Sequence, residues 1–231
     1  MLKVENVETW GFEHAIRGMR NPMNSWAKSD SSWEWVEDES PINTDDPGMM
    51  FIVGKKDLEL MQKLCKAGSE HRKFMRQIFV SMDITAPFYL WKELDTYKVG
   101  TVANSCSTMH KLTAKPFELS DFSCEHLIGD ETVDFDDVHF NMNHYPYGVM
   151  LILVYTLNVW REKYLQTKDK KYWWQMIQLL PSSYNQKRTI TMNYENALTI
   201  IKQRTGHKLD EWSVLIEKLL ELPYLKEIAD L

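Results

Sequence analysis

The sequence predicts an α+β fold in which several helices surround a modest sheet of antiparallel or mixed strands. In some segments apolar residues recur at helical spacing, and in others short runs of β-branched and aromatic residues alternate with polar ones. The length of 231 residues suits one domain or a tight pair, and no internal repeat is present. We therefore predict a single domain over residues 1–231.

The first predicted elements are a short strand and a helix within residues 3–20, where the helix covers FEHAIRGMR. A long polar loop follows at 21–48 and carries Trp26, Trp33 and Trp35 among acidic and serine residues. Loops longer than ~12–15 residues are usually functional or disordered. We interpret this loop as an acidic flap that shields its own tryptophans, with a substrate lid as the alternative.

A second helix is predicted over 57–67, because its apolar residues share one face, Asp57 is a suitable N-cap and Gly68 can end it. The segment IFVSMDI at 78–84 alternates with a period of two residues, which predicts a strand. Pro87 suits the first position of the helix that follows, FYLWKELDTY.

The middle of the chain is less regular. Residues 98–108 are small and polar, which predicts a loop, and 115–146 give no assignment. The helix predicted at 148–165 is apolar nearly all round at its start, so we expect it to be central. A further helix at 172–180 is stopped by Pro181.

The C-terminal part combines one strand with helices. KRTITM at 187–192 is strand-like, and Asn193 at its end suits the N-cap of a helix over 194–203, which ends near Gly206. Another helix is predicted at 210–220.

Composition argues against several classes of protein. The 27 Lys+Arg and 33 Asp+Glu give a net charge of -6, so we predict no binding to nucleic acid, which needs clustered cations. The longest apolar run, 149–155, is far shorter than the ~20 residues of a membrane span, and MLKVENVETW lacks the apolar core of a signal peptide. Three cysteines without C-x-x-C spacing, and scattered histidines that include His139 and His144, indicate no disulfide framework and no metal site. We expect a cytoplasmic protein.

The unusual feature of the composition is its 9 Trp, 10 Tyr and 9 Phe, with 13 Met beside them. Such side chains suit a core, and equally a pocket for planar ligands. Several tryptophans fall in predicted helices, where we expect positions in the core or in a subunit interface. They are Trp160, Trp173, Trp174 and Trp212.

Two segments contain residues that could carry chemistry. The loop at 98–110 offers hydroxyl and amide groups that can wrap a phosphate together with backbone N–H groups, although a self-bonded polar turn explains them as well. These residues are Thr101, Asn104, Ser105, Ser107 and Thr108. The segment at 186–204 ends in Arg204, which either binds an anionic ligand bidentately or complements the helix dipole.

Together these segments resemble the flavin-dependent thymidylate synthases, the ThyX family, through most of the chain. HAIRGMRNP is similar to the family's early helix, which ends in an Arg, and this places Arg20 on that Arg. LMQKLCKAGSE is similar to the next helix and its Gly-His-Glu turn, with Ser69 in place of His. VSMDITAP is similar to the strand F-T-F-H-V-x-A-P and places Asp83 where the family has a flavin-associated His.

The C-terminal segment gives the best match. LLPSSYNQKRTITMNYENALTIIKQRTGHKLDEW is similar to the family's L-P…T-x-N-x-R-S-L…L-R…A-Q-W-E. The intervals from Pro181 to Asn193 and from Asn193 to Arg204, 12 and 11 positions, fit without a gap. The resemblance implies that Arg204 binds dUMP and that Asn193 lines the flavin site, with Gln203 and His207 flanking the same surface.

The family's signature, R-H-R-x-x-S-x-N-E-x-S-x-R-Y, is only partly present. The corresponding stretch is TYKVGTVANSCSTMH, with one inserted residue, and it retains Asn104 and Ser107. Thr96, Tyr97 and Lys98 replace Arg-His-Arg. The other replacements are Ser105 for Glu, Met109 for Arg, His110 for Tyr, Glu93 for the Gln before the signature and Ile177 for the Arg before Leu-Pro. The cations that could substitute for those lost are Lys98, Lys187 and Arg188.

The resemblance implies an enzyme that methylates dUMP reductively to dTMP, using FAD, NADPH and methylenetetrahydrofolate, and that assembles as a homotetramer. The alternative is an inactive or repurposed relative that binds a nucleotide or a partner protein. In the enzyme, Arg204 would stabilise negative charge on the pyrimidine. The implied substrate-binding residues are Arg20, Glu93, Lys98, Asn104, Ser105, Ser107, Thr108 and Arg204. The implied cofactor-binding residues are Asp83, Thr96, Tyr97, Lys98, Asn193, Thr199 and His207. The tryptophans of the 21–48 loop could cover a bound flavin or folate.

Overall fold

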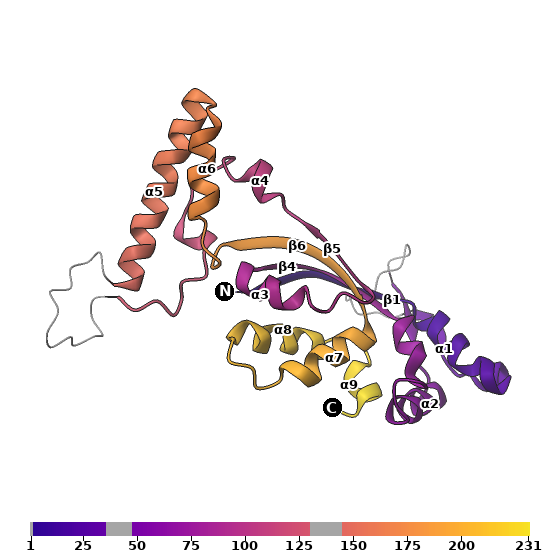
Figure 1. Ribbon diagram of the computed structural model, residues 1–231. Helices are drawn as coiled ribbons and strands as arrows, with labels where there is room; N and C mark the ends of the chain where they lie inside the picture. Colours follow the sequence, from indigo (N-terminus) through magenta and orange to yellow (C-terminus); the bar gives the residue numbers. More distant parts are fainter. Residues whose placement is uncertain (1, 36–47, 130–144) are drawn as a thin grey trace, which may run out of the picture. The chain divides into compact units, whose positions relative to one another are not determined.

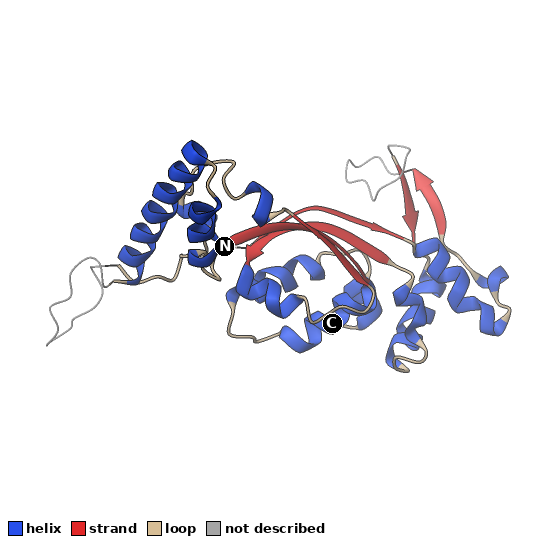
Figure 2. Ribbon diagram, turned by 45° about the horizontal axis from the view of Figure 1, so that its top comes forward, coloured by secondary structure: helices blue, strands red, loops and turns tan. Residues whose placement is uncertain are grey.

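The computed structural model describes residues 2–35, 48–129 and 145–231, and it confirms the predicted α+β class (Figure 1, Figure 2). The strands are β1 (Lys3–Trp10), β2 (Ser32–Trp35), β3 (Met49–Ile52), β4 (Phe79–Pro87), β5 (Thr101–Ser105) and β6 (Asn185–Asn193). The α-helices are α1 (Phe12–Arg20), α2 (Lys55–Lys66), α3 (Phe88–Leu94), α4 (Thr108–Lys111), α5 (Pro146–Thr167), α6 (Lys170–Leu179), α7 (Tyr194–Arg204), α8 (Asp210–Leu220) and α9 (Leu225–Ala229). Short 3₁₀ helices are η1 (Asn21–Met23), η2 (Trp26–Lys28), η3 (Arg72–Arg76) and η4 (Leu119–Asp121).

Two sheets are present in the described part of the chain. The larger has four strands in the order β1-β4-β6-β5, so β1 and β5 form its edges. The smaller pairs β2 with β3 antiparallel and places Trp33 opposite Phe51. Along β4 the side chains alternate as a strand requires, with Val80 and Met82 buried and Asp83 on the opposite, half-exposed face.

Packing divides the chain into two compact units, which we describe separately. Unit 1 comprises Met1–Lys3, Thr85–Asp95 and Ser105–Lys187, and unit 2 comprises Val4–Ile84, Thr96–Asn104 and Arg188–Leu231. One boundary follows α3, between Asp95 and Thr96, and the others fall inside β1, β4 and β6 and at the last residue of β5. Strands of the larger sheet therefore contribute to both units. The single domain over residues 1–231 stays a prediction.

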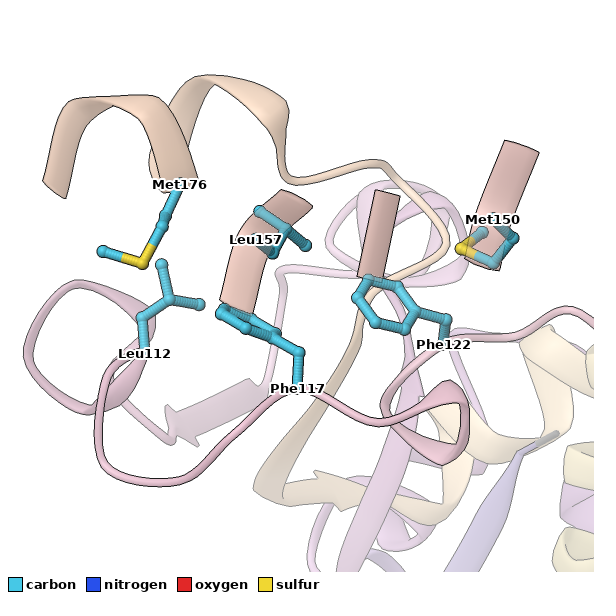
Figure 3. Packing of buried hydrophobic residues seen from close by; sticks show 6 residues of the cluster. All are labelled: Leu112, Phe117, Phe122, Met150, Leu157 and Met176. Carbon is cyan, nitrogen blue, oxygen red and sulfur yellow. The ribbon is translucent and has the colours of Figure 1, made fainter. Parts of the chain in front are cut away.

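Unit 1 has its own hydrophobic core, formed where α5 packs on α6 and on the segment before them (Figure 3). The cluster consists of Leu112, Phe117, Phe122, Met150, Leu157 and Met176, with Trp160 and Trp173 packed against it. Asn158 ties α5 to this segment, because its side chain bonds both the N–H and the carbonyl of Phe117 at 2.8 and 2.9 Å. Each fully buried side chain of this size stabilises the fold by about 1.5–3 kcal/mol.

The prediction that the helix at 148–165 is central is wrong for the chain by itself. The buried residues of α5 are Gly148, Met150, Leu157 and Arg161. Large apolar residues on its other faces are exposed instead, namely Val149, Leu151, Ile152, Tyr155 and Val159. Packing among the described residues therefore leaves much of the apolar surface of this helix exposed.

Unit 2 is built around the buried face of its sheet strands, which α7 and α8 cover (Figure 1, Figure 2). Its fully buried residues include Ala15, Met61, Ile78, Val80, Met82, Ile84, Leu198, Trp212 and Leu215. Tyr194 is also completely buried, and its hydroxyl donates to the carbonyl of Pro223 at 3.0 Å. Burial raises the pKa of this phenol far above its ordinary value, so it stays protonated.

Several predicted elements are confirmed within a few residues, namely those at 3–20, 57–67, 78–84, 172–180, 187–192, 194–203 and 210–220. Two caps differ from expectation. Gly54, rather than Asp57, is the N-cap of α2, and Pro87 is the N-cap of α3 rather than its first residue. Gly68 follows α2 with a φ of 104°, as its predicted role at the helix end requires.

Both predicted loops contain short regular elements. The 21–48 loop includes η1, η2 and β2, and its residues 36–47 lie outside the described part of the chain. The 98–108 loop contains β5 and begins α4, while β3 and α9 were not predicted. Residues 130–144, which include His139 and His144, also lie outside the described part.

No helix in the described ranges is long and apolar enough to cross a membrane. Within the same ranges, no group of His, Cys, Asp and Glu side chains is arranged to hold a metal ion.

Candidate functional site

The loop at 98–110, which could wrap a phosphate, has its first half fixed to helix α7 in unit 2. The Asn196 side-chain amide donates to the carbonyl of Val99 at 2.5 Å and to the hydroxyl of Thr101 at 2.9 Å. Between them Gly100 has a φ of 74°, and a Cβ there would come within 2.5 Å of the Asn193 side-chain nitrogen. Only glycine suits this backbone conformation and close approach, so Gly100 itself determines the conformation of the loop here.

Asn193 is the N-cap of α7, as predicted. Its side-chain oxygen accepts a hydrogen bond from the Asn196 N–H at 3.0 Å, and the residue is buried. This capping fully accounts for an Asn at this position. Its role in lining a flavin site stays a prediction.

Arg204 lies at the last residue of α7 and contacts Tyr97, the residue just before the predicted loop. Its Nε donates to the Tyr97 hydroxyl at 2.9 Å, and that hydroxyl donates to Gln203 Oε1 at 3.0 Å. The guanidinium carbon lies 4.7 Å from the Trp212 ring centroid and 5.6 Å from the Tyr97 centroid. The planar cation is therefore held against two aromatic rings, an arrangement that contributes roughly 0.5–2 kcal/mol.

The other predicted residues of this part of unit 2 lie on the 96–104 segment or just after α7. Lys98 and Thr96 are exposed, and no ion-pair partner for Lys98 exists within the described ranges. Asn104 is exposed near the end of β5. The His207 ring meets Trp212 edge-on at 6.2 Å, and its Nδ1 accepts from the Leu209 N–H at 3.1 Å. The structure thus places Tyr97 and His207 beside Arg204, the first on its side chain and the second on its backbone carbonyl.

Asp83 lies on the half-exposed face of β4, where it accepts hydrogen bonds from two neighbouring strands. The Asn6 side-chain amide donates to it at 2.9 Å and the Thr189 hydroxyl at 2.6 Å. The Thr191 hydroxyl of β6 and the Ser81 hydroxyl of β4 lie 3.4 Å apart. This face of the sheet is polar, although the strands carry an apolar face opposite it.

The predicted residues of unit 1 are held by local hydrogen bonds. Ser107 caps α4, its hydroxyl accepting from the His110 N–H at 3.2 Å. The Thr108 hydroxyl accepts from the Gln186 side-chain amide at 3.1 Å, and the same amide donates to the carbonyl of Cys106 at 2.9 Å. This half of the loop follows the self-bonded alternative. Of the remaining predicted residues of this unit, Ser105 is exposed and Glu93 is half-buried.

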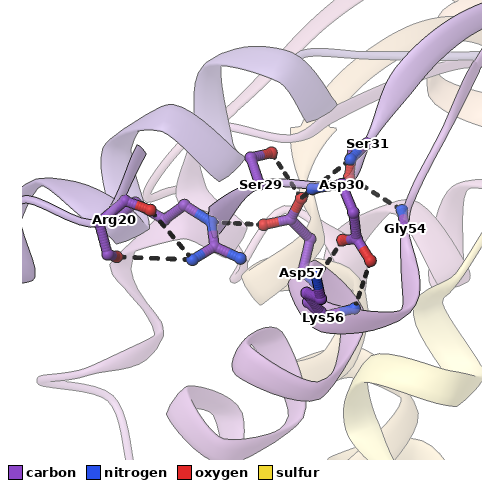
Figure 4. A network of polar contacts seen from close by, with 8 residues as sticks. Arg20, Ser29, Asp30, Ser31, Gly54, Lys56 and Asp57 are labelled. Atoms are coloured by element: carbon purple, nitrogen blue, oxygen red, sulfur yellow. Dashed lines mark hydrogen bonds and ion pairs between the residues drawn. The ribbon is translucent and has the colours of Figure 1, made fainter. Parts of the chain in front are cut away.

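Thr199 and Arg20 are also engaged within the protein. The Thr199 hydroxyl donates to the carbonyl of Glu195 within α7, at 2.8 Å. Arg20 is buried, and its Nε lies 2.6 Å from Asp57 Oδ1 (Figure 4). Their binding roles stay predictions.

Asp57 is the residue that the sequence reasoning missed. Its carboxylate is fully buried and accepts hydrogen bonds from the Ser29 hydroxyl at 2.6 Å and the Ser31 hydroxyl at 2.7 Å, besides the Asp30 N–H (Figure 4). Burial by itself would raise the pKa of this carboxyl, but these hydrogen bonds and Arg20 outweigh it and lower the pKa below its ordinary value. An aspartate at the start of a helix signals capping, and nothing local indicates the distant partners.

No protein-family model matches the chain, and no curated protein matches its sequence. The fold, however, is similar over the whole chain to solved structures of flavin-dependent thymidylate synthases.

One is a crystal structure of thymidylate synthase X (ThyX) from Helicobacter pylori with FAD and dUMP, with a TM-score of 0.64 and 18% identity. The match covers 99% of this chain and 97% of that one. Another structure of the H. pylori enzyme complexed with FAD and dUMP has a TM-score of 0.61 and 16% identity, and covers 97% of both chains. At this identity the likeness establishes the fold alone.

Proposed function

We propose that the protein binds FAD and a dUMP-like nucleotide and catalyses the reductive methylation of dUMP to dTMP. Methylenetetrahydrofolate would be the one-carbon donor and NADPH the reductant. The observation that carries this proposal is the likeness of the fold, over nearly the full length of both chains, to structures solved with FAD and dUMP. The local resemblance around Asn193 and Arg204 supports it independently.

The donor set of unit 2 fits an anionic ligand. Lys98 and Asn104 are exposed on the loop that α7 holds, and Lys98 has its charge uncompensated by any described residue. Lysine cations and side-chain amides both donate hydrogen bonds of the kind that phosphate recognition uses. We assign Lys98 and Asn104 to holding the phosphates of the nucleotide or of FAD.

Arg204 has the role of stabilising charge. A bound flavin would supply the electron transfer and the relay of the one-carbon unit. The protein would position the pyrimidine and stabilise the negative charge that develops on its carbonyl oxygen. The guanidinium of Arg204 suits this task, because its stacking on Trp212 and its bond to Tyr97 fix its plane before any ligand arrives.

One observation favours the alternative, a relative that binds a nucleotide without catalysis. The Tyr97 hydroxyl takes the Nε donor of Arg204, at a position where the family's signature has a His. The Arg204 guanidinium then has one N–H group fewer to donate to a ligand. A binding module would tolerate this loss better than an enzyme.

We also propose that the protein assembles as a homo-oligomer, a tetramer by the family resemblance. The exposed apolar residues of α5 and α6 support this, since a large exposed apolar patch marks an interaction site. They are Val149, Leu151, Ile152, Tyr155, Val159, Trp174 and Leu179. A cytoplasmic location stays a prediction.

The purified full-length chain tests the proposal. Visible flavin absorbance, together with dUMP-dependent oxidation of NADPH, is the expected result. Protein that is colourless and cannot be reconstituted with FAD would overturn it. Protein that binds FAD and dUMP but forms no dTMP from methylenetetrahydrofolate would establish the non-catalytic alternative.

A further inference from the structure

Unit 2 contains a pocket of about 350 Å³ that lies between α1 and the first part of the 21–48 loop. Small-molecule sites typically measure about 300–1,000 Å³ and are mainly apolar with a few polar groups. Ile16 and Phe51 contribute buried apolar surface, while Trp26 and Trp33 contribute aromatic surface from the loop. Its size and lining therefore match a site for one small, flat molecule.

The two tryptophans of the pocket are held in place while remaining accessible. Trp26 and Trp33 are 50% and 45% exposed, which is high for such large apolar side chains. The Trp26 indole N–H donates to the Asn21 side chain at 2.8 Å, and the Trp33 ring packs edge-on against Phe51 at 5.3 Å. The loop therefore presents ordered aromatic surface to solvent instead of burying it, contrary to the flap interpretation.

The pocket also carries one carboxylate and one uncompensated cation. Glu13 and Arg17 lie four residues apart on α1, so about 6 Å of helix rise separates them. Arg17 has no ion-pair partner in the described part of the chain, whereas Asp57 neutralises Arg20, the other arginine of the lining. Glu13 receives one long hydrogen bond, from the Trp33 indole at 3.4 Å.

Hydrogen bonds within the protein hold the part of the pocket lining that contains Ser29 and Ser31. Asp57 accepts hydrogen bonds from Ser29 and Ser31, both of which line the pocket, and so ties this part of the loop to α2 (Figure 4). A site that is already ordered loses less conformational entropy when a ligand binds.

We propose that this pocket binds a flat heterocycle that carries both an exocyclic amine and an anionic group. The ring packs against Trp26 and Trp33, the amine donates to Glu13 and the anion pairs with Arg17. Folates and adenine nucleotides both have this chemistry, and only the folate source rests on the proposed function. The Glu13 carboxylate selects against simple anions. Its negative charge repels an anion that has no amine to donate a hydrogen bond to it.

Calorimetric titration of the full-length chain tests the proposal, with folic acid and AMP as probes and adenosine as the probe without an anion. We expect folic acid or AMP to bind, and adenosine to bind more weakly. Arg17→Ala should weaken binding of the anionic probe by about tenfold or more, since it removes a charge-assisted contact. It should leave adenosine unchanged. Trp33→Ala should weaken binding of every probe.

Matched controls separate the pocket from general effects. Lys28→Ala removes a cation of the same loop outside the pocket, and Trp35→Ala removes an exposed tryptophan of the same strand. Neither should change binding. Arg17 is an exposed side chain without a described partner, so its variant should fold even if Trp33→Ala does not.

The proposal is overturned if neither folic acid nor AMP binds, or if Arg17→Ala binds both as well as the unaltered chain does. FAD and dUMP binding are measured on the same preparations. If these two bind while both probes fail, only the pocket assignment falls. If a probe binds through Arg17 while FAD does not, the proposed function falls and the pocket stands.

Discussion

Arg20 and Asp57 form a buried ion pair in which Arg20 Nε and Asp57 Oδ1 lie 2.6 Å apart, with side chains 5% and 0% exposed. The pair joins the end of α1 to the first turn of α2, and the carboxylate also accepts hydrogen bonds from the Ser29 and Ser31 hydroxyls and from the Asp30 N–H. A buried charge is tolerated only when it is paired and hydrogen-bonded. The pair therefore holds the 21–31 segment, and with it one wall of the pocket.

Asp57→Ala should lower the free energy of unfolding by about 3–5 kcal/mol, because it leaves the Arg20 charge buried and unpaired. Urea unfolding followed by circular dichroism measures this. Asp230→Ala is the matched control, since it breaks an exposed pair with Lys66 and should cost at most about 1 kcal/mol. Equal losses in the two variants would contradict the role given to Asp57.

The same pair should make stability depend on pH. The pKa of the Asp57 carboxyl is lower in the folded protein than its ordinary value of 3.8, so the unfolded chain binds a proton more readily. The stabilisation is fully present above the unfolded pKa and is lost as the pH falls through the folded one. The difference in unfolding free energy between the unaltered chain and Asp57→Asn should shrink below about pH 4. A constant difference from neutral to acidic pH would refute this.

Glu195 should couple η3 to α7, the helix that carries Arg204. Its carboxylate, 14% exposed, pairs with Arg72 Nε at 3.0 Å and also with Arg76. Burial opposes ionisation, but the two arginines outweigh it and lower the pKa of Glu195. Glu195→Gln should cost about 1.5–3 kcal/mol, the usual value of hydrogen bonds to a charged group.

The two arginines should contribute unequally. Arg76 is 50% exposed and Arg72 21%, so Arg76→Ala should cost less than about 1 kcal/mol and Arg72→Ala more. Double-mutant cycles with Glu195→Gln, measured by denaturant unfolding, isolate each pair. If the coupling energy of Glu195 with Arg76 exceeds its coupling energy with Arg72, the more exposed contact is the stronger one and this prediction is wrong.

The sequence predicted the elements that local signals specify, such as Asn193 at the start of α7 and the alternating residues of β4. It missed β5 because Thr101–Ser105 consists mainly of small and polar residues, and such an edge strand depends on its neighbour for pairing. Local sequence signals also did not indicate the contacts between distant segments. Asp57 looked like a helix cap, and no local signal indicated that Tyr97 contacts Arg204.

Arg204→Ala should weaken dUMP binding by at least about tenfold, because it removes a cation from the proposed nucleotide site. The unfolding free energy should fall by only about 0.5–2 kcal/mol, the value of stacking on Trp212 and Tyr97. Arg204→Lys keeps the charge but not the planar group, so it should recover stability poorly. Lys202→Ala, exposed on the same helix, is the control. Unchanged dUMP affinity in Arg204→Ala would remove this residue from the proposed site.

The exposed apolar surface of α5 should be covered by another copy of the chain. Tyr155 is 71% exposed and Ile152 44%, on a helix that buries only part of its surface within the chain. A charge introduced into an apolar interface loses hydration without gaining a partner, so Ile152→Glu should shift the protein to smaller species. Light scattering coupled to size-exclusion chromatography measures the mass, and circular dichroism verifies the fold. Val7→Glu places the same change on β1, where Val7 is 43% exposed, and should leave the mass unaltered. A mass that is the same for all three proteins would mean that α5 does not contribute to assembly.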